Sequence, residues 1–327
     1  MSRALVTGGG GFIGAYLVRA LVENGWDVAV VDNLVRGREG RLTPVADRIE
    51  WHRGDVRDVA LMTEAARGAD VLFHLAAVNG TENFYNHPDL VLDVGLRGAL
   101  AAVEAAAAAG VPDLVMASSA EVYQTPPVVP TDENVPLMLP DSLNPRYSYG
   151  GSKIVTELIA FNYFRDRFRK VQVFRPHNVY GPDMGWKHVV PQFILRAQEA
   201  IRAHPTGTVP FPIQGDGSET RAFCYVDDIV DGIRLMQAEG GHREVYHIGS
   251  PEMVSIAGLV DLLGAHFGRD FEVVPSDAAE GGTRVRCPDV AKLAALGYRP
   301  KVPLAEGLAR TAAWYGEHDA PSGETLL

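Results

Sequence analysis

The chain has 327 residues, of which 46% are hydrophobic and 22% are charged, so it is long enough for one large globular domain or two smaller ones. Its formal net charge of -11 argues against a general nucleic-acid or anionic-membrane surface, because no basic block offsets it. Two cysteines, Cys224 and Cys287, lie far apart without metal-ligand spacing, which indicates neither a disulfide framework nor a metal site. The first predicted strand begins almost at Met1 and the longest apolar stretch, 99–109, is broken by Glu104, so we expect a cytoplasmic protein with no membrane span.

The stretch ALVTGGGGFIG at residues 4–14 joins a short apolar strand to a helix through a run of glycines. Gly8, Gly11 and Gly14 have no Cβ, so the backbone can approach a pyrophosphate, and the helix that begins near Phe12 offers it free N–H groups. Glycine runs also occur in ordinary loops, but the apolar strand before this run and the apolar helix after it are the context that a dinucleotide-binding turn requires. The stretch therefore predicts a cradle for a dinucleotide.

Short apolar strands alternate with helical patterns through the first half of the chain. Strands with continuous apolar character, separated by helices, predict a parallel sheet that helices cover on both faces, which is a doubly wound α/β fold. Ligands of such sheets bind beyond the carboxyl ends of the strands. The predicted strands are 4–7, 27–31, 49–52, 71–75, 114–118 and 171–175, and the predicted helices among them are 12–24, 59–66, 89–109 and 147 to about 168.

Two aspartates lie at the ligand-binding ends of predicted strands. Asp32 ends the second strand about 20 residues past the glycines, where a carboxylate can accept hydrogen bonds from the adenosine ribose hydroxyls. This position predicts NAD, although Arg36 and Arg38 are close enough in sequence to keep NADP open. Asp55 ends the third strand and can reach the adenine amino group. Alternatively, either aspartate caps a turn.

Tyr149 and Lys153 are four residues apart, which places their side chains on one face of a helix. A lysine ammonium beside a phenol favours the phenolate, so Tyr149 is a candidate general base towards a substrate hydroxyl. Ser119, at the end of a strand that points at the same crevice, can hydrogen-bond that hydroxyl. Such a Tyr and Lys pair alone is typical of a solvated helix surface, but the glycine turn and the SSAEVY segment upstream favour catalysis.

Eight motifs follow one another along the chain: TGGGGFIG at 7–14, DNL at 32–34, GDV at 54–56, HLAA at 74–77, SSAEVY at 118–123, YGGSK at 149–153, RPHNVYGP at 175–182 and RAFCYVDD at 221–228. With them the chain resembles, essentially from end to end, an extended short-chain dehydrogenase/reductase of the nucleotide-sugar epimerase/dehydratase family. The resemblance implies a Rossmann doubly wound parallel sheet that binds NAD, and a smaller C-terminal α/β lobe that binds a nucleoside diphosphate sugar.

The resemblance also implies the boundaries of these two parts. The NAD-binding domain is expected to comprise residues 1–175 and about 223–250, and the substrate-binding lobe about 176–222 and 251–327. In relatives, the helices that correspond to 89–109 and to 147–168 form the four-helix bundle of a homodimer. A homodimer is therefore expected here, although the alanine-rich helix could equally pack against the sheet of its own chain.

The family motifs imply roles for particular residues. The expected cofactor-binding residues are Gly8, Gly11, Phe12, Ile13, Gly14, Asp32, Asn33, Asp55, Val56, Leu75, Ala76, Ala77, Tyr149 and Lys153. The expected substrate-binding residues are Ser119, Ala120, Glu121, Asn178, Arg221, Arg284 and Arg286. The arginines suit a diphosphate because a guanidinium can pair with two phosphate oxygens. For Arg284 and Arg286 the alternative is a solvated surface.

The family chemistry implies that Tyr149 takes a proton from a sugar hydroxyl, usually at C4, while hydride passes to NAD and a 4-keto sugar forms. An epimerase returns the hydride to the other face of the sugar, whereas a dehydratase or decarboxylase needs further groups that act at C5. Glu121 discriminates between them, because related dehydratases and some decarboxylases carry a glutamate here. Ala120 cannot protonate a leaving hydroxyl, which disfavours an aspartate-type dehydratase. The alternative to a catalytic role for Glu121 is a salt bridge or a solvated strand end.

We therefore predict an NAD-dependent nucleotide-sugar epimerase that acts at C4. One alternative is a dehydratase or decarboxylase that uses Glu121 as the C5 base. Another is a non-catalytic protein that binds and senses NAD, and the intact Tyr149 and Lys153 argue against it.

Some positions depart from the family pattern. Gly95 stands where relatives carry Asn, and Gln124 replaces the usual Gly after SSAEVY. His177, Lys187 and His188 are candidates to select an acidic sugar substituent, although single His and Lys residues in such loops more often face solvent.

Overall fold

The computed structural model of the protein describes residues 2–277 and 284–318. Within those residues, seven parallel strands form a central sheet with the order β11-β6-β5-β4-β1-β2-β3. The strand order reverses between β1 and β4, so a ligand crevice is expected beyond the carboxyl ends of these strands. The strands are β1 (Arg3–Thr7), β2 (Asp27–Asp32), β3 (Ile49–Arg53), β4 (Val71–His74), β5 (Asp113–Ala117), β6 (Lys170–Pro176) and β11 (Glu244–Ile248).

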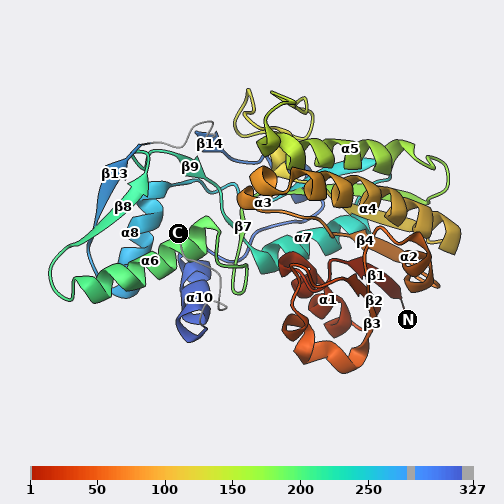
Figure 1. Ribbon diagram of the computed structural model, residues 1–327, viewed down its shortest axis with the longest axis horizontal. Coiled ribbons are helices and arrows are strands. Elements are labelled where there is room, and N and C mark those ends of the chain that lie inside the picture. The colour runs from red at the N-terminus through yellow and green to blue at the C-terminus, as the bar shows by residue number, and fades with distance from the viewer. Residues whose placement is uncertain (1, 278–283, 319–327) are drawn as a thin grey trace.

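Helices cover both faces of the sheet, as Figure 1 shows. Along β1, Leu5 contributes to the hydrophobic cluster with α2, α4 and α5, whereas Ala4 and Val6 contribute to the cluster with α1 and α7, because successive strand residues point to opposite faces. This arrangement confirms the predicted doubly wound α/β fold. The covering helices are α2 (Val59–Ala65), α4 (Pro88–Ala109) and α5 (Ser148–Asn162) on one face, and α1 (Phe12–Glu23) and α7 (Val226–Glu239) on the other.

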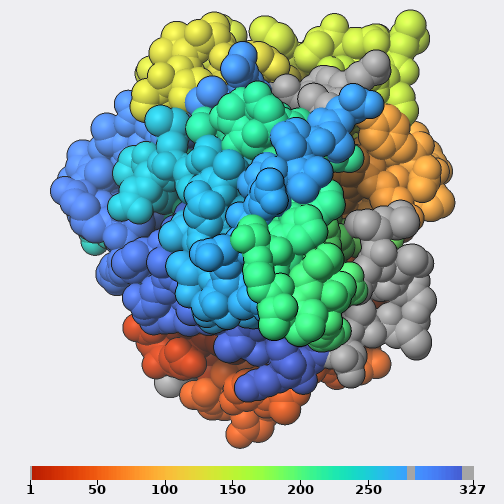
Figure 2. Space-filling view, turned by 90° about the vertical axis from the view of Figure 1, so that its left-hand side faces the viewer, coloured from red at the N-terminus to blue at the C-terminus, as the bar shows by residue number. Residues whose placement is uncertain are grey.

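A second group of elements lies beside the sheet, on the left in Figure 1 and facing the viewer in Figure 2. It has a hydrophobic cluster of its own, which includes Phe193, Phe211, Leu259 and Leu308. We propose that this group is the predicted C-terminal lobe, with the boundaries given above. Its larger elements are α6 (Val189–Ala203), β8 (Val209–Gln214), α8 (Ile256–Phe267), β13 (Phe271–Ser276) and α10 (Leu304–Glu317).

Short strands and helices complete the described structure. In one small sheet, Arg221 of β9 and Arg286 of β14 are register partners, so two arginines distant in sequence stand on neighbouring strands. The short strands are β7 (Val179–Tyr180), β9 (Thr220–Arg221), β10 (Cys224–Tyr225), β12 (Val254–Ser255) and β14 (Val285–Arg286). The short helices are η1 (Glu39–Arg48), α3 (Thr81–Asn86), η2 (Ala120–Val122), η3 (Pro145–Tyr147) and α9 (Ala291–Ala294).

Two sequence-based expectations about local structure were wrong, and one helix was not predicted. Helix α5 ends at Asn162 rather than near Phe168, because Tyr163 is extended and Phe164 has φ 52°. Helix α6 was not predicted, and its Pro191 lies in the first turn, where a missing N–H costs little. Strand β3 ends at Arg53, so Asp55 lies in the loop after it.

Helices α4 and α5 approach each other closely at Gly95. An added Cβ at Gly95 would stand 2.9 Å from Ser152 Cβ, and Ser152 is buried. We therefore expect Gly95→Ala to lower the free energy of unfolding by about 1–3 kcal/mol, because the helices must move apart. Urea unfolding followed by circular dichroism measures this change.

Gly151→Ala is the matched control on α5, where an added Cβ has its nearest neighbour at an ordinary 3.4 Å. It should leave stability unchanged or raise it by up to about 1 kcal/mol, since alanine favours a helix over glycine. Equal losses in both variants would contradict the close contact at Gly95.

Candidate active site

The glycine turn after β1 can be formed only with glycines at its closest contacts. Gly8 has φ 71°, and an added Cβ there would stand 2.8 Å from the backbone nitrogen of Ala76. A Cβ on Gly14 would stand 2.1 Å from the carbonyl oxygen of Gly8. Helix α1 follows at Phe12, and its N-cap is Gly11, which has no capping side chain. The turn therefore leaves room and backbone donors for a pyrophosphate, which fits the dinucleotide predicted from the sequence.

Asp32, at the end of β2, is buried and already oriented by the backbone. Its Oδ2 accepts a hydrogen bond from Gly10 N at 2.9 Å, and its Oδ1 accepts one from Leu34 N at 2.8 Å. Each carboxylate oxygen keeps a further lone pair, so Asp32 can also accept from ribose hydroxyls. The site thus fits NAD.

Arg36 and Arg38, which were considered as possible contacts of the 2′-phosphate of NADP, interact with other residues. Arg38 forms an ion pair with Asp183. Arg36 acts electrostatically on Tyr149 and His188, which places it near the proposed catalytic residues. Neither arrangement favours a 2′-phosphate beside Asp32.

Arg41 links the glycine turn to the segment after β7. It donates one hydrogen bond to Gly10 O at 3.1 Å and another to Asp183 Oδ2 at 2.9 Å. Burial, with Arg38 nearby, lowers the pKa of Arg41 to about 10. It therefore remains a cation at neutral pH and holds the two segments together.

Asp55 forms an ion pair in this structure. Arg57 donates to it at 2.6 Å and Asn33 Nδ2 donates at 3.2 Å. The Arg57 hydrogen bond lowers the pKa of Asp55 to about 2, so the carboxylate is ionised. The contact of Asp55 with adenine, predicted from the sequence, remains a prediction.

Tyr149, Lys153 and Ser119 come together beyond β5, as their spacing predicted. Tyr149 and Lys153 lie on the buried face of α5, and Tyr149 stacks on Phe84 with a ring separation of 5.2 Å. The ammonium of Lys153 lies 5.8 Å from the centroid of the Tyr149 ring. Ser119, the N-cap residue of η2, hydrogen-bonds the Tyr149 phenol. These side chains can therefore act on one substrate hydroxyl.

The expectation that Lys153 favours the Tyr149 phenolate is wrong for the chain by itself. Burial raises the pKa of Tyr149 to about 12, and the hydrogen bond from Ser119 opposes this rise only in part. Lys153 instead donates to the carbonyl oxygen of Ala117 at 2.7 Å, and its own burial lowers its pKa to about 8. The groups of the chain alone thus hold Tyr149 as a neutral phenol near pH 7.

Glu121 is paired with Arg286. The Arg286 Nη1 donates to Glu121 Oε1 at 2.6 Å, and the two side chains are 15% and 29% exposed. Glu121 also acts on Tyr149, where its charge contributes to the raised pKa. Glu121 therefore lies close to the catalytic residues, and Arg286 reaches them from β14 rather than from a solvated surface.

The other predicted substrate residues surround Arg286. Arg221 is half-buried and donates to the carbonyl oxygen of Thr220 at 2.8 Å. Burial lowers its pKa, and Arg286 lowers it further, so two cations share one region. Asn178 donates to the carbonyl oxygen of Ala222 at 3.1 Å, and the side chain of Arg284 is exposed. The paired arginines suit an anionic group such as a diphosphate.

The three residues considered for an acidic substituent do not form a cationic cluster. His177 is buried rather than solvent-facing, and neither ring nitrogen has a hydrogen-bond partner among the described residues. Burial holds its pKa well below the usual range, so His177 is neutral. Burial likewise lowers the pKa of His188 to about 4, and Lys187 pairs with Glu82 at 2.6 Å.

Two residues beneath the site were missed by the sequence analysis. Glu157 follows Lys153 by four residues on α5, and it forms a buried ion pair with Arg175 of β6. The spacing of Glu157 was a usable signal, because positions four apart share a helix face. Its partner could not be inferred, since it comes from another element.

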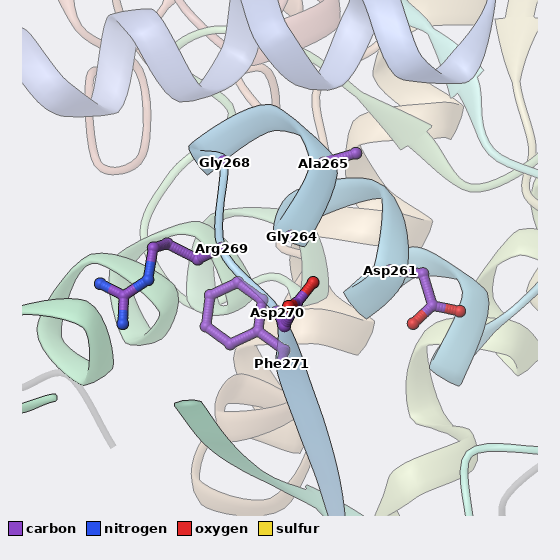
Figure 3. Close-up of a pocket in the computed structure, with 7 residues that line it drawn as sticks. All are labelled: Asp261, Gly264, Ala265, Gly268, Arg269, Asp270 and Phe271. Carbon is purple, nitrogen blue, oxygen red and sulfur yellow. The ribbon is translucent and has the colours of Figure 1, made fainter. Parts of the chain in front are cut away.

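A pocket on the second lobe contains none of the predicted site residues. Figure 3 shows it between the end of α8 and the start of β13, with Asp261, Arg269, Asp270 and Phe271 around it. Arg269 donates to the carbonyl oxygens of His204 and Gly207. This pocket therefore belongs to the packing of the lobe, away from Tyr149 and Lys153.

Residues 2–277 and 284–318 contain neither a membrane-spanning helix nor a cluster of metal-ligating side chains. No helix there has the length and hydropathy that a bilayer crossing requires. The same residues contain no group of three or more His, Cys, Asp or Glu side chains placed to hold a metal ion. Cys224 and Cys287 are buried and free.

The fold and the site together define a Rossmann-type enzyme that binds NAD. Residues 4–249 match the model of the NAD dependent epimerase/dehydratase family. The chain belongs to this family, and Gly8, Asp32, Tyr149 and Lys153 all lie in the matched range. It is therefore an enzyme of the NAD-dependent nucleotide-sugar epimerase/dehydratase type.

The similar proteins differ in activity. The chain is 32% identical to a dTDP-glucose 4,6-dehydratase of Streptomyces antibioticus, with 97% of this chain and 93% of that protein covered. It is 31% identical to a putative UDP-glucose 4-epimerase of Methanocaldococcus jannaschii, with 95% and 97% covered. The structure of a dTDP-glucose 4,6-dehydratase from Streptomyces venezuelae with NAD and TYD bound has a TM-score of 0.84, 31% identity, and coverage of 96% and 97%.

The lowered pKa of Lys153 makes stability depend on pH. Below about pH 8 the ammonium is charged in both states, and between about pH 8 and 10.5 the unfolded state binds more protons than the folded state. Stability contributed by this group therefore rises with pH across that window. Between the two ends of this pH window, the free energy of unfolding of the wild type should rise by up to about 3 kcal/mol relative to that of Lys153→Met.

Urea unfolding of both proteins at several pH values measures this difference. The comparison with Lys153→Met removes the effects of the other titrating groups, Tyr149 included, as far as those groups behave alike in both proteins. A difference that is constant with pH would show that Lys153 has an ordinary pKa.

Proposed function

We propose that the protein is an NAD-dependent nucleotide-sugar epimerase that acts at C4. The observation that carries this proposal is the ion pair between Glu121 and Arg286 at 2.6 Å. A carboxylate that must remove a C5 proton needs a lone pair free for it, whereas Oε1 of Glu121 already accepts a hydrogen bond from Arg286. With Ala120 beside it, the segment then offers no separate acid and base for elimination.

The remaining groups are those that an epimerase needs. The glycine turn and Asp32 would hold NAD, which supplies the acceptor and donor of hydride at the sugar carbon. Tyr149 would take the proton from the C4 hydroxyl and later return it, and Ser119 would orient that hydroxyl. Because burial raises the pKa of Tyr149 to about 12, proton removal requires further positive charge near the phenol when the ligands are bound.

The nucleotide-sugar substrate is supported by cations on the lobe. Arg221 is the diphosphate contact in this proposal, because Arg286 on the neighbouring strand stays with Glu121, and a diphosphate can receive a bidentate contact from a guanidinium. The similar Streptomyces venezuelae dehydratase has TYD bound. We propose a nucleoside diphosphate sugar as the substrate, with Asn178 as a further contact.

A C5-active dehydratase or decarboxylase is the second candidate. It is favoured by the position of Glu121, whose charge acts on Tyr149 and which is therefore close to a sugar that Tyr149 contacts. The similar dehydratases also favour it. In that reaction Arg286 would leave Glu121 when the diphosphate binds.

A homodimer and a cytoplasmic location are also proposed. The outer faces of α4 and α5 carry exposed apolar side chains, Leu92, Val155 and Leu158. Burial of such side chains against a second copy would remove them from water.

Turnover in deuterated water distinguishes the two reactions. The enzyme is mixed with UDP-, GDP-, CDP- and dTDP-sugars, and the products are followed by NMR. We expect a C4 epimer without deuterium at C5, because hydride returns to the carbon from which it came. Deuterium at C5 with loss of the C6 hydroxyl, or release of carbon dioxide, would reject the C4 epimerase. Tyr149→Phe is the control and should abolish turnover while NAD remains bound.

Glu121→Gln tests the same choice by rate. For a C4 epimerase we expect turnover to fall by less than about tenfold, whereas loss of a general base costs about 100-fold or more. The amide can still accept a hydrogen bond from Arg286, so the contact between η2 and β14 is kept. Steady-state kinetics with the sugar found above measures the change, and a loss of the larger size would support the C5 base.

A further inference from the structure

Beneath the candidate active site, a continuous chain of hydrogen bonds runs through buried polar side chains. Arg175 donates to both carboxylate oxygens of Glu157, from Nε at 2.8 Å and from Nη2 at 2.6 Å. The Nη1 of Arg175 donates to the Tyr123 hydroxyl, which lies 2.7 Å from His247 Nε2. Glu157 and Arg175 are 5% and 3% exposed, so this is an ion pair in the protein interior.

This chain meets the catalytic residues at the end of β5. Ser118 donates to Glu157, and the residue before it, Ala117, supplies the carbonyl oxygen to which Lys153 donates. Lys153 and Glu157 are one helical turn apart on α5 and both are buried. Glu157 therefore contacts the strand end on which Lys153 rests and places a negative charge near its ammonium.

Stability alone does not explain such a pair. Removal of two charges from water costs several kcal/mol for each ion, and apolar replacements of buried pairs are often as stable or more so. An ion pair at this position, within one helical turn of Lys153, is better explained by its effect on that lysine.

We propose that the Glu157–Arg175 ion pair is a positioning element of the active site, which fixes the end of β5 for Lys153 and keeps the Lys153 ammonium charged. The inference rests on the proposed function for the catalytic roles of Lys153 and Tyr149. Glu157 and Arg175 themselves act through Lys153 and do not touch the reacting groups.

The charged and titratable groups around Lys153 determine whether its pKa is raised or lowered. Tyr149 and Glu157 face it from α5, and His74 faces it from β4, with Arg175 of β6 behind Glu157. Burial lowers the pKa of Lys153 to about 8, and Glu157 opposes this. His74 is neutral because burial, with the charge of Lys153, lowers its pKa to about 3, and burial keeps Tyr149 neutral as well. Among these groups, Glu157 is the anion that favours the Lys153 ammonium.

The protonation of Lys153 can be observed directly, because the chain has only five lysines: Lys153, Lys170, Lys187, Lys292 and Lys301. Lysine labelled with ¹³C at Cε gives few NMR signals, and Lys153→Arg assigns the signal of Lys153. The NAD-loaded protein is titrated as wild type and as Glu157→Gln/Arg175→Gln, which removes both charges together. We expect the midpoint of Lys153 to fall by about 1 pH unit or more in the double variant, since a nearby opposite charge shifts a pKa by that much.

Asp113 and Arg169 provide a matched control. Arg169 donates to both carboxylate oxygens of Asp113, at 2.9 and 2.8 Å. This pair lies at the first residue of β5 and just before β6, at the ends of these strands away from Lys153. Asp113→Asn/Arg169→Gln therefore makes the same charge change away from Lys153 and should leave the midpoint of Lys153 in place. An equal shift in both double variants, or no shift in either, would overturn the proposal.

Arg175→Lys is a milder substitution, and it tests the direction in which the titration midpoint of Lys153 moves. It keeps a cation but loses the bidentate contact, so the Glu157 carboxylate is less neutralised and the midpoint of Lys153 should rise. A fall would overturn the proposal, and this variant remains informative if the double variant does not fold, as circular dichroism shows.

Turnover supplies a second readout. The pH profile of kcat is measured with the sugar identified above. In the Glu157→Gln/Arg175→Gln variant, the alkaline fall of kcat should begin at a lower pH than in the wild type, whereas the control should keep the wild-type profile. A uniform fall of kcat at every pH would indicate a purely structural role and overturn the proposal. If no sugar is turned over, the proposed function fails, whereas the NMR titration still decides this inference.

Discussion

The hydrogen bond from Lys153 to the carbonyl oxygen of Ala117 fixes α5 to the end of β5, and the arrangement of the candidate active site depends on it. Without this contact the buried ammonium would lose its hydrogen-bond acceptor among the described residues, and a buried charge without a partner is strongly unfavourable. The contact also determines where Tyr149 stands, because the two side chains share one helix face. Ser119, two residues beyond Ala117, is then within reach of the phenol. One buried donor thus sets the positions of the three groups assigned to proton transfer.

Much of the fold could be predicted because its signals are local. The apolar strands and the glycines at Gly8 and Gly14 each report a constraint from the immediate neighbourhood of the residue. The end of α5 was missed because Phe164 adopts a left-handed conformation that its residue type does not signal. Helix α6 was not predicted, although its proline lies in a first turn that tolerates it.

The site was less predictable than the fold, since its electrostatics depend on partners distant in sequence. Arg286 pairs with Glu121 across 165 positions, and no spacing rule reveals such a contact. The pKa of Tyr149 shows the same limit. Its spacing from Lys153 indicated a favoured phenolate, but burial of the phenol outweighs a lysine that is hydrogen-bonded elsewhere. Spacing predicts which groups meet, whereas depth in the protein decides their charge.

Arg41 has a consequence for the entropy of cofactor binding. It joins Gly10 of the glycine turn to Asp183 of the segment after β7, so the turn is held from outside as well as by its own backbone. A flexible phosphate loop would lose conformational freedom when it binds the cofactor. In this protein the glycine turn loses that freedom when the chain folds. Preorganisation of this kind raises affinity without any added contact to the ligand. It also means that displacement of the Asp183 segment would loosen the cofactor cradle, although the segment itself lies outside it.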